Sequence, residues 1–177
     1  MNKAVFLDRD GVINNVVFRY GNNLKPIAPW SMKEFRLIPG IEKPLLDLSK
    51  SGFKLFIVTN QPDIAKGVIS QTFVEKVNKN ILRDLPIDEI KVCPHVDLNG
   101  CDCRKPKSGM ITSLAIKWDI DCQKSFMIGD NWKDIESGKK TGATTILLEK
   151  HYNRSVDADY TASNLSQAVE IINQISG

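Results

Sequence analysis

Short apolar runs alternate with amphipathic segments along the whole chain. The runs at 3–7, 54–58, 89–92, 125–128 and 144–148 are typical of buried strands. Between and after them, segments with apolar residues at helical spacing predict helices over 42–50, 72–82, 109–118, 133–141 and 165–175. This alternation predicts one α/β domain over 1–177, Rossmann-like and three-layered, with a mainly parallel sheet covered by helices on both faces.

Two longer stretches do not fit this alternation. Residues 14–39 carry several prolines and glycines, and residues 94–108 are rich in Cys, Asp, Lys and Pro. Long irregular loops in a small domain are more often functional than not. Both follow the carboxyl end of a predicted strand, where open α/β sheets bind their ligands. We therefore expect these loops to surround a site.

Composition and charge narrow the class of protein. The chain has 177 residues, of which 42% are hydrophobic and 25% charged, as in an ordinary globular domain. A net charge of +3 is too mild to indicate nucleic acid or a membrane surface as the partner. The first apolar run is too short for a signal peptide, and no stretch is long enough to span a bilayer. We expect a cytoplasmic enzyme that acts on a small molecule, as a monomer.

The first candidate motif follows the first strand. Asp8 and Asp10 are two residues apart, so extended backbone points both carboxylates the same way, and Gly11 allows a sharp turn after them. Paired carboxylates at a strand end suit Mg²⁺, a hard cation that prefers oxygen ligands. Taken alone, the motif is as compatible with a solvated Asp-Gly turn.

Two further motifs supply donors and a cation. The second strand ends in Thr59, Asn60 and Gln61, whose side chains can donate hydrogen bonds to phosphate oxygens. Lys105 precedes a predicted helix and can neutralise charge on a phosphoryl group. Alone, the first favours a capping turn, and the second is as readily a basic surface loop.

A fourth motif completes an ordered set. Asp130 ends the strand at 125–128, and Asp134 lies four residues on, in the first turn of the next helix. Alone, this pair fits an N-cap and a surface acid. The four motifs together place carboxylates, donors and a lysine near one edge of the sheet, a combination that independent surface roles do not explain.

Three cysteines and a histidine form a compact cluster in the second loop. Cys93, His95, Cys101 and Cys103 lie within eleven residues and offer three thiolates and one imidazole, the ligand set of a structural zinc site. Free buried cysteines or a regulatory disulfide are the alternatives. Because Cys103 lies two residues before Lys105, zinc here would fix a catalytic loop. Cys122 is left over.

The order of the motifs resembles the haloacid dehalogenase superfamily of phosphatases. The matching residues are D-R-D-G-V at 8–12, V-T-N at 58–60, Lys105, and G-D-N-W-K-D at 129–134. The resemblance implies a phosphomonoester hydrolase with Asp8 as nucleophile and Asp10 as general acid and base. It also implies that Thr59 and Asn60 hold the phosphoryl group, while Lys105 pairs with Asp8 and phosphate.

The same resemblance implies a magnesium site and an aspartyl-phosphate intermediate on Asp8. The ligands of the magnesium ion would be Asp8, the backbone carbonyl of Asp10, and Asp130, with Asp134 in support.

Within that superfamily, a Cys/His loop leading into C-R-K-P resembles the heptose bisphosphate phosphatases and the related histidinol phosphatase domains. No insert is large enough for a separate cap domain, so the loops 14–39, 61–68 and 94–107 would set specificity. The resemblance gives Gln61 and Arg104 contacts to the distal part of the substrate, and a guanidinium suits a second phosphate. The chain departs from the group at Asp63 and at Lys66, which stands in place of an arginine, and its zinc loop is shorter. Its first loop lacks the group's glycine–tyrosine–valine pattern at 16–21 and carries Trp30.

Three interpretations remain open from the sequence. The first is a sugar-phosphate phosphatase that removes the 7-phosphate of a heptose 1,7-bisphosphate. The second is hydrolysis of histidinol phosphate. The third is a non-enzymatic phosphoacceptor domain of the receiver type, which also carries aspartates at strand ends.

Overall fold

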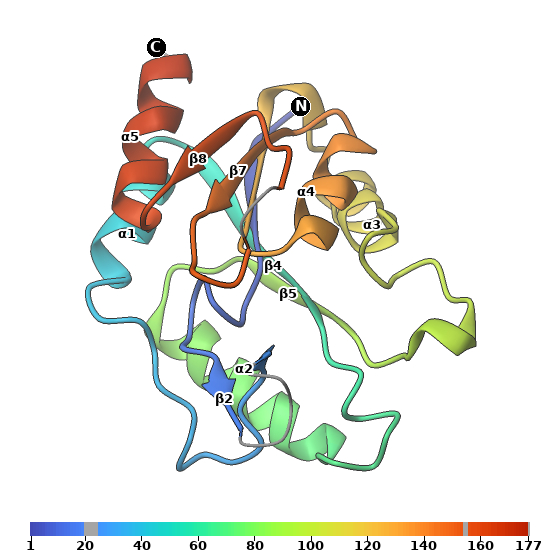
Figure 1. The fold of residues 1–177 in the computed structure, drawn as a ribbon. Coiled ribbons are helices and arrows are strands. Elements are labelled where there is room, and N and C mark those ends of the chain that lie inside the picture. Colours follow the sequence, from blue (N-terminus) through green and yellow to red (C-terminus); the bar gives the residue numbers. More distant parts are fainter. Residues whose placement is uncertain (20–24, 154–155, 177) are drawn as a thin grey trace.

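The chain folds around a six-stranded, wholly parallel sheet (Figure 1). The structure is a computed structural model that describes residues 1–19, 25–153 and 156–176. The strands are ordered β5-β4-β1-β6-β7-β8. Their bounds are β1 Lys3–Leu7, β4 Phe53–Asn60, β5 Glu89–Cys93, β6 Phe126–Gly129, β7 Thr144–Leu148 and β8 Tyr160–Ala162. The chain winds outward in both directions from β1, which makes the carboxyl end of β1 the switch point of the topology.

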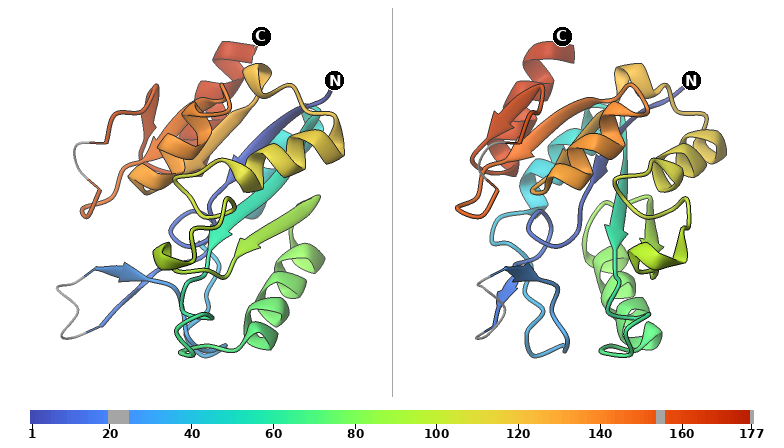
Figure 2. Two further views of the ribbon diagram at one scale, coloured as in Figure 1. Left: turned by 90° about the vertical axis from the view of Figure 1, so that its right-hand side faces the viewer. Right: turned by 45° about the vertical axis from the view of Figure 1, so that its right-hand side comes forward.

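Helices cover both faces of the sheet, which gives the predicted three layers (Figure 2). One face carries α1 (Glu42–Lys50), α2 (Gln71–Asp84) and α5 (Leu165–Ser176), and the other carries α3 (Gly109–Trp118) and α4 (Trp132–Lys139). Short 3₁₀ helices span Asp97–Asn99 and Cys122–Lys124.

Alternation along β1 divides the core between these faces. Val5 and Leu7 pack with the helices of the first face, whereas Ala4 and Phe6 pack with α3 on the second. All four side chains are fully buried, as expected for the centre of a parallel sheet.

Most of the predicted elements are confirmed. The bounds of β1, α1, α3 and β7 agree with the prediction, and the others differ by one or two residues at an end. Ser70 caps α2 by accepting a hydrogen bond from the backbone N–H of Phe73, and Asn164 accepts one from Gln167 at the start of α5.

Three short strands were not predicted. β8 is partly exposed, and β2 (Val17–Phe18) and β3 (Pro26–Ile27) form an antiparallel ribbon within the first irregular loop. Strands of two or three residues are too short to show a periodicity. Between β1 and α1 this ribbon is the only regular structure among the described residues, so no cap domain is present there. Tyr20 and Gly21, from the first-loop pattern noted above, lie outside the described residues.

No helix in the described part of the chain is long and apolar enough to cross a membrane.

Candidate active site

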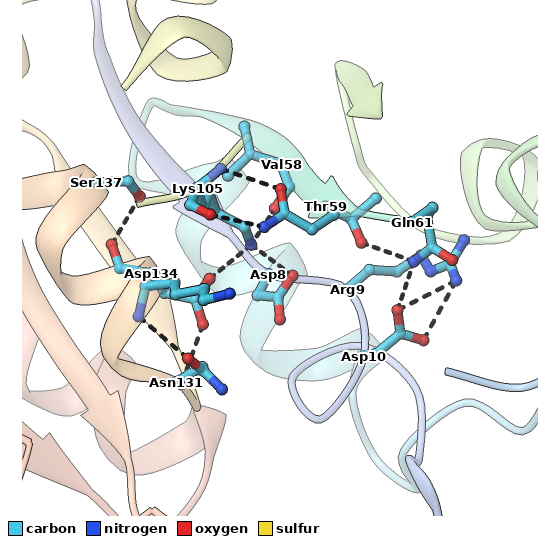
Figure 3. Close-up of polar contacts among 12 residues, drawn as sticks. Asp8, Arg9, Asp10, Val58, Thr59, Gln61, Lys105, Asn131, Asp134 and Ser137 are labelled. Atoms are coloured by element: carbon cyan, nitrogen blue, oxygen red, sulfur yellow. Dashed lines mark hydrogen bonds and ion pairs between the residues drawn. The ribbon is translucent and has the colours of Figure 1, made fainter. Parts of the chain in front are cut away.

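The predicted motifs converge at the carboxyl edge of the three central strands (Figure 3). Asp8 follows β1, Thr59 lies at the end of β4, and Asp130 follows β6. Lys105 reaches the same place from the loop between β5 and α3. The neighbouring strands β4, β1 and β6 are in parallel register, which brings together side chains about 50 and 120 residues apart in sequence.

Lys105 is the buried centre of the site. Its Nζ lies 2.7 Å from Oδ1 of Asp8 and 2.6 Å from Oδ1 of Asp134, and it donates to the carbonyl of Val58 at 2.6 Å. Burial alone would lower the pKa of this amine, but Asp134 and Asp8 more than offset that effect and raise it. Lys105 is therefore a fixed, charged ammonium beside the expected nucleophile.

Three carboxylates, those of Asp8, Asp130 and Asp134, surround this one lysine. Each offers an oxygen within 4.8 Å of the others. Burial and the charge of Asp134 raise the pKa of Asp130 to about 7, and the same two causes raise the pKa of Asp8 although Lys105 opposes them. The site thus holds more negative charge than its lysine balances, and its hard oxygen donors suit a divalent cation such as Mg²⁺.

The contacts separate Asp134 from the other two acids. One oxygen of Asp134 faces Lys105, and the other accepts the backbone N–H of Asn131 at 3.1 Å, as part of a capping box at the start of α4. Both oxygens are thus engaged, in keeping with the supporting role expected for Asp134. In contrast, Oδ2 of Asp8 and Oδ1 of Asp130 have no hydrogen-bond partner among the described residues and remain free to bind a cation.

Asp10 lies in a separate set of hydrogen bonds. Its carboxylate faces the buried Arg9 at 3.2 Å and accepts from Asn14 at 2.9 Å and from Gln61 at 2.7 Å. Both Asp8 and Asp10 line the same cavity, as the spacing of two predicts, but the carboxylate of Asp10 is not part of the acidic cluster. The Asp10 carboxylate is therefore separate from the three acids that could hold a metal ion.

Two glycines allow the strand ends to approach one another. Gly11 has φ +94°, and a Cβ there would lie 1.9 Å from Oδ2 of Asp130. A Cβ on Gly129 would lie 2.2 Å from Cβ of Asp134. Both positions exclude a side chain because the backbone packs directly against the acids.

The residues at the end of β4 organise their neighbours. The Asn60 amide donates to the backbone carbonyl of Lys105 at 3.0 Å and accepts from its N–H at 3.1 Å, which fixes the lysine loop. Gln61 is buried and donates to Thr59 and Asp10, so its side chain orients the expected acid/base. Thr59 faces the cavity.

The site opens into a cavity of about 290 Å³ with a basic rim. The lining includes three basic side chains, those of Lys66, Arg104 and Lys133, which we call the basic rim, and the ribbon contributes Pro26 and Ile27. Arg104 donates from Nε to Asp97 at 2.6 Å, while its buried Nη1 has no hydrogen-bond partner among the described residues. Arg104 thus carries an unpartnered donor on a side chain that lines the cavity.

The cysteines and the histidine also come together. The Sγ atoms of Cys93, Cys101 and Cys103 lie 3.1–3.7 Å apart, and Nδ1 of His95 lies 3.3 Å from Cys103. These separations are too long for a disulfide and near the ~3.8 Å between two sulfurs on one tetrahedral zinc. Burial first, then the Cys103 thiol, raises the pKa of the Cys93 thiol to about 12. A bound metal cation would act in the opposite direction, because it binds the thiolate form. The four side chains can therefore hold one metal ion.

Several site residues were not predicted. Arg9 lies inside the first motif and Asn14 two residues after it, and both hold Asp10. Lys133 lies inside the fourth motif and lines the cavity. The available signal was their position in or next to a motif. Tyr152 donates a hydrogen bond to Asp130 at 2.5 Å, and nothing in the local sequence marks it.

The chain is similar in sequence to bacterial phosphatases. A family model described as HAD-hydrolase-like matches residues 102–172. A D-glycero-alpha-D-manno-heptose-1,7-bisphosphate 7-phosphatase of Campylobacter jejuni is 32% identical over 97% of this chain and 96% of its own length. A D-glycero-beta-D-manno-heptose-1,7-bisphosphate 7-phosphatase of Rhodopseudomonas palustris is 36% identical over 82% of this chain and 83% of its own length.

The fold matches as well. The crystal structure of a D,D-heptose 1,7-bisphosphate phosphatase from B. bronchiseptica, complexed with magnesium and phosphate, superposes with a TM-score of 0.83 at 24% identity and covers 98% of this chain and 99% of that one. At that identity the structural match supports the fold, and the sequence relatives support the family. The chain belongs to the D-glycero-D-manno-heptose 1,7-bisphosphate 7-phosphatase family of haloacid-dehalogenase-like hydrolases.

Proposed function

We propose that this protein is a magnesium-dependent phosphomonoesterase that removes the 7-phosphate of D-glycero-D-manno-heptose 1,7-bisphosphate. The observation that carries the proposal is the arrangement around Lys105, which holds one oxygen of Asp8 at 2.7 Å and leaves the other facing the cavity. A carboxylate so placed is ready to attack phosphorus, because the cation beside it offsets the repulsion between two anions.

The reaction has two halves in this proposal. In the first, Oδ2 of Asp8 bonds to phosphorus, the bond from phosphorus to the sugar oxygen breaks, and Asp10 gives its proton to that leaving oxygen. In the second, the Asp10 carboxylate takes a proton from water, whose oxygen attacks phosphorus. The bond between Asp8 and phosphorus then breaks, which releases phosphate and restores both acids.

The hydrogen bonds around Asp10 support its double role. Arg9, Asn14 and Gln61 fix the carboxylate at the cavity wall without engaging the acidic cluster. Thr59 and Asn60 line the cavity beside Asp8, where they would hold the phosphoryl oxygens.

Asp8, the Asp10 backbone carbonyl and Asp130 would hold Mg²⁺, with Asp134 supporting Lys105. The excess negative charge of the cluster and the two free carboxylate oxygens fit such a cation. When bound, magnesium neutralises charge on the phosphoryl group and on the nucleophile.

Cys93, His95, Cys101 and Cys103 would hold a structural zinc ion. Four protein ligands leave no open position for substrate or water, which is typical of structural rather than catalytic zinc. The ion would fix the loop that carries Arg104 and Lys105.

The rim of the cavity supports a substrate with a second phosphate. Lys66, Arg104 and Lys133 make the rim basic, and Nη1 of Arg104 is buried without a partner among the described residues. Histidinol phosphate carries an imidazole at its distal end and no second anion there, so it would leave these basic side chains without an acidic partner on the substrate. The basic rim therefore favours the sugar bisphosphate.

Removing Arg104 tests this assignment. Arg104→Ala loses a charged hydrogen bond to the distal phosphate, worth about 1.5–3 kcal/mol, so we expect kcat/KM for the bisphosphate to fall roughly 10–100-fold. For p-nitrophenyl phosphate, which has nothing distal to bind, the loss should be small. Equal losses on the two substrates would instead assign Arg104 to the support of Lys105.

The proposal as a whole is tested by steady-state phosphate release over a panel of phosphorylated metabolites. The panel includes both anomers of the heptose bisphosphate, histidinol phosphate and p-nitrophenyl phosphate, with Asp8→Asn as the inactive control. A preference for a heptose bisphosphate is expected, and a preference for histidinol phosphate would contradict it. Slow, stoichiometric phosphorylation of Asp8 without turnover would indicate a receiver-type phosphoacceptor.

In this proposal residues 1–177 act as one catalytic domain, because the catalytic groups, the cavity and the cysteine cluster all border one sheet edge. The partner is a small phosphorylated sugar in the cytoplasm, and the mild net charge of +3 fits no nucleic-acid or membrane partner. Action as a monomer is part of the proposal, since the described chain alone completes the site.

A further inference from the structure

The segment after β7 lies against the acidic cluster, although no motif marks it. The Tyr152 hydroxyl donates to Oδ2 of Asp130 at 2.5 Å. The next residue, Asn153, donates from Nδ2 to the backbone carbonyls of Asp130 and Leu148, both at 2.7 Å. Asp130 is thus held at its side chain and at its backbone by two consecutive residues of one loop.

These contacts decide which oxygen of Asp130 faces the cluster. A carboxylate on a short side chain can rotate, and a single hydrogen bond to one oxygen fixes the direction of the other. Gly11 packs against the same Oδ2 and would place a Cβ 3.1 Å from the Tyr152 hydroxyl, so the three groups meet at one point. With Oδ2 engaged there, Oδ1 is left for a cation.

The other two acids of the cluster are held by a lysine and not by Tyr152. Asp8 and Asp134 are both held by Lys105, which makes no hydrogen bond or ion pair to Asp130 within the described chain. Tyr152 is therefore the only side-chain donor to the Asp130 carboxylate among the described residues.

The ring of Tyr152 connects this contact to the ribbon formed by β2 and β3. Its centroid lies 5.0 Å from that of His151 and 5.9 Å from that of Phe18, which belongs to β2 of the ribbon. Phe18 and His151 are 5.3 Å apart, so the three rings form one cluster. This packing holds the hydroxyl in place, and Tyr152→Phe keeps the packing while it removes the hydrogen bond.

We propose that Tyr152 is a positioning residue that orients Asp130 for binding Mg²⁺ and so sets the magnesium affinity of the enzyme. This rests on the proposed function, in which Asp130 is a magnesium ligand. Hydrogen bonds to the ligands of a metal typically contribute 10–100-fold in affinity or activity. The effect belongs to the metal and not to the phosphoryl transfer itself, since Tyr152 does not contact Asp8 or Asp10 through any hydrogen bond in the described chain.

The test compares wild type, Tyr152→Phe and the control Tyr160→Phe, which removes a hydroxyl from the partly exposed strand β8. Isothermal titration with Mg²⁺, on protein freed of magnesium by dialysis with its zinc retained, gives the Kd. We expect Tyr152→Phe to raise that Kd by roughly 10–100-fold and the control to leave it unchanged.

Two further measurements distinguish positioning from a structural role. The magnesium concentration that half-activates hydrolysis should rise in Tyr152→Phe by the same factor as the Kd, while kcat at saturating magnesium stays within a few-fold of wild type. The Tm of the magnesium-free variant should match that of wild type. A lowered Tm with an unchanged Kd would make Tyr152 structural and overturn the proposal.

The same experiment distinguishes this proposal from the function on which it rests. A wild type that hydrolyses the bisphosphate with magnesium, beside a Tyr152→Phe variant with the same Kd, overturns the positioning role alone. A wild type that neither binds magnesium nor releases phosphate overturns the proposed function and the positioning role with it.

Discussion

At the scale of single residues, the site depends on which acid each cation holds. Lys105 pairs with Asp8 and Asp134, whereas Arg9 pairs with Asp10, so the nucleophile and the acid/base have separate partners. In the proposed reaction, the acid that exchanges protons is thus held apart from the acid that attacks phosphorus. This division also predicts that substitutions of Asp8 and Asp10 have different effects on catalysis and on magnesium binding.

Asp10→Asn should lower kcat by roughly 10²–10⁴-fold, because it removes the proton that the leaving oxygen needs. The amide oxygen still accepts from Arg9 or Gln61, so the fold should persist. Magnesium affinity should be nearly unchanged, since the Asp10 carboxylate is outside the acidic cluster. Titration calorimetry and steady-state kinetics check both parts. A large loss of magnesium affinity with normal kcat would assign Asp10 to the metal instead.

At the scale of elements, the strand ends were predictable and the contacts between loops were not. Apolar runs that stop at Asp8, Thr59 and Asp130 identify parallel strands, and the carboxyl ends of neighbouring parallel strands meet at one edge. Hydrogen bonds between residues that are far apart in the sequence have no such signal. The hydrogen bond from Trp30 to Asp63 at 2.9 Å joins two residues that the sequence marked only as departures from the family pattern.

That pair fastens two of the predicted specificity loops together. Asp63 accepts from Trp30 with one oxygen and from Lys66 with the other at 2.9 Å, so the first loop and the basic rim share one carboxylate. A local sequence pattern does not reveal the contact between Trp30 and Asp63, because the two residues come from separate segments. The two departures therefore belong to one arrangement.

Trp30→Phe removes the indole donor and keeps an aromatic ring. A net hydrogen bond contributes about 0.5–1.5 kcal/mol, so we expect KM for the bisphosphate to rise roughly 2–12-fold with little change in kcat. The KM for p-nitrophenyl phosphate, which does not reach the rim, serves as the control. A fall in kcat on both substrates would show that the contact supports the catalytic groups rather than the rim.

The cysteine cluster also lies in an irregular loop. A metal bound there would stabilise that loop in place of a hydrophobic core. Cys101→Ser should reduce zinc from about one per chain to a small fraction. Because metal binding contributes folding free energy, Tm should fall by roughly 5 °C or more, at about 2–4 °C per kcal/mol for a domain of this size. Elemental analysis and thermal unfolding check this, with Cys122→Ser, outside the cluster, as the control. Full zinc content in Cys101→Ser would contradict it.

At the scale of the whole molecule, the fold places several buried acids at one sheet edge, and this couples stability to pH and magnesium. In the metal-free protein, burial and Asp134 raise the pKa of Asp130 from 3.8 to about 7. Between these values the folded state binds more protons at this group than the unfolded state does. The stability of the metal-free protein from this source is therefore greatest below about pH 4 and is lost as pH rises towards 7.

Magnesium should act in the opposite direction, because it binds the ionised carboxylates and must displace this proton. Below about pH 7, its affinity should fall by up to about tenfold for each unit that the pH is lowered, and above 7 it should level off. The rise in Tm caused by a fixed magnesium concentration should accordingly grow from pH 5.5 to 7 and then remain constant. Thermal unfolding across this range, with and without magnesium, makes the measurement. A magnesium-induced shift that is the same at every pH would show that Asp130 is already ionised in the metal-free protein, and that Lys105 suffices to balance the cluster.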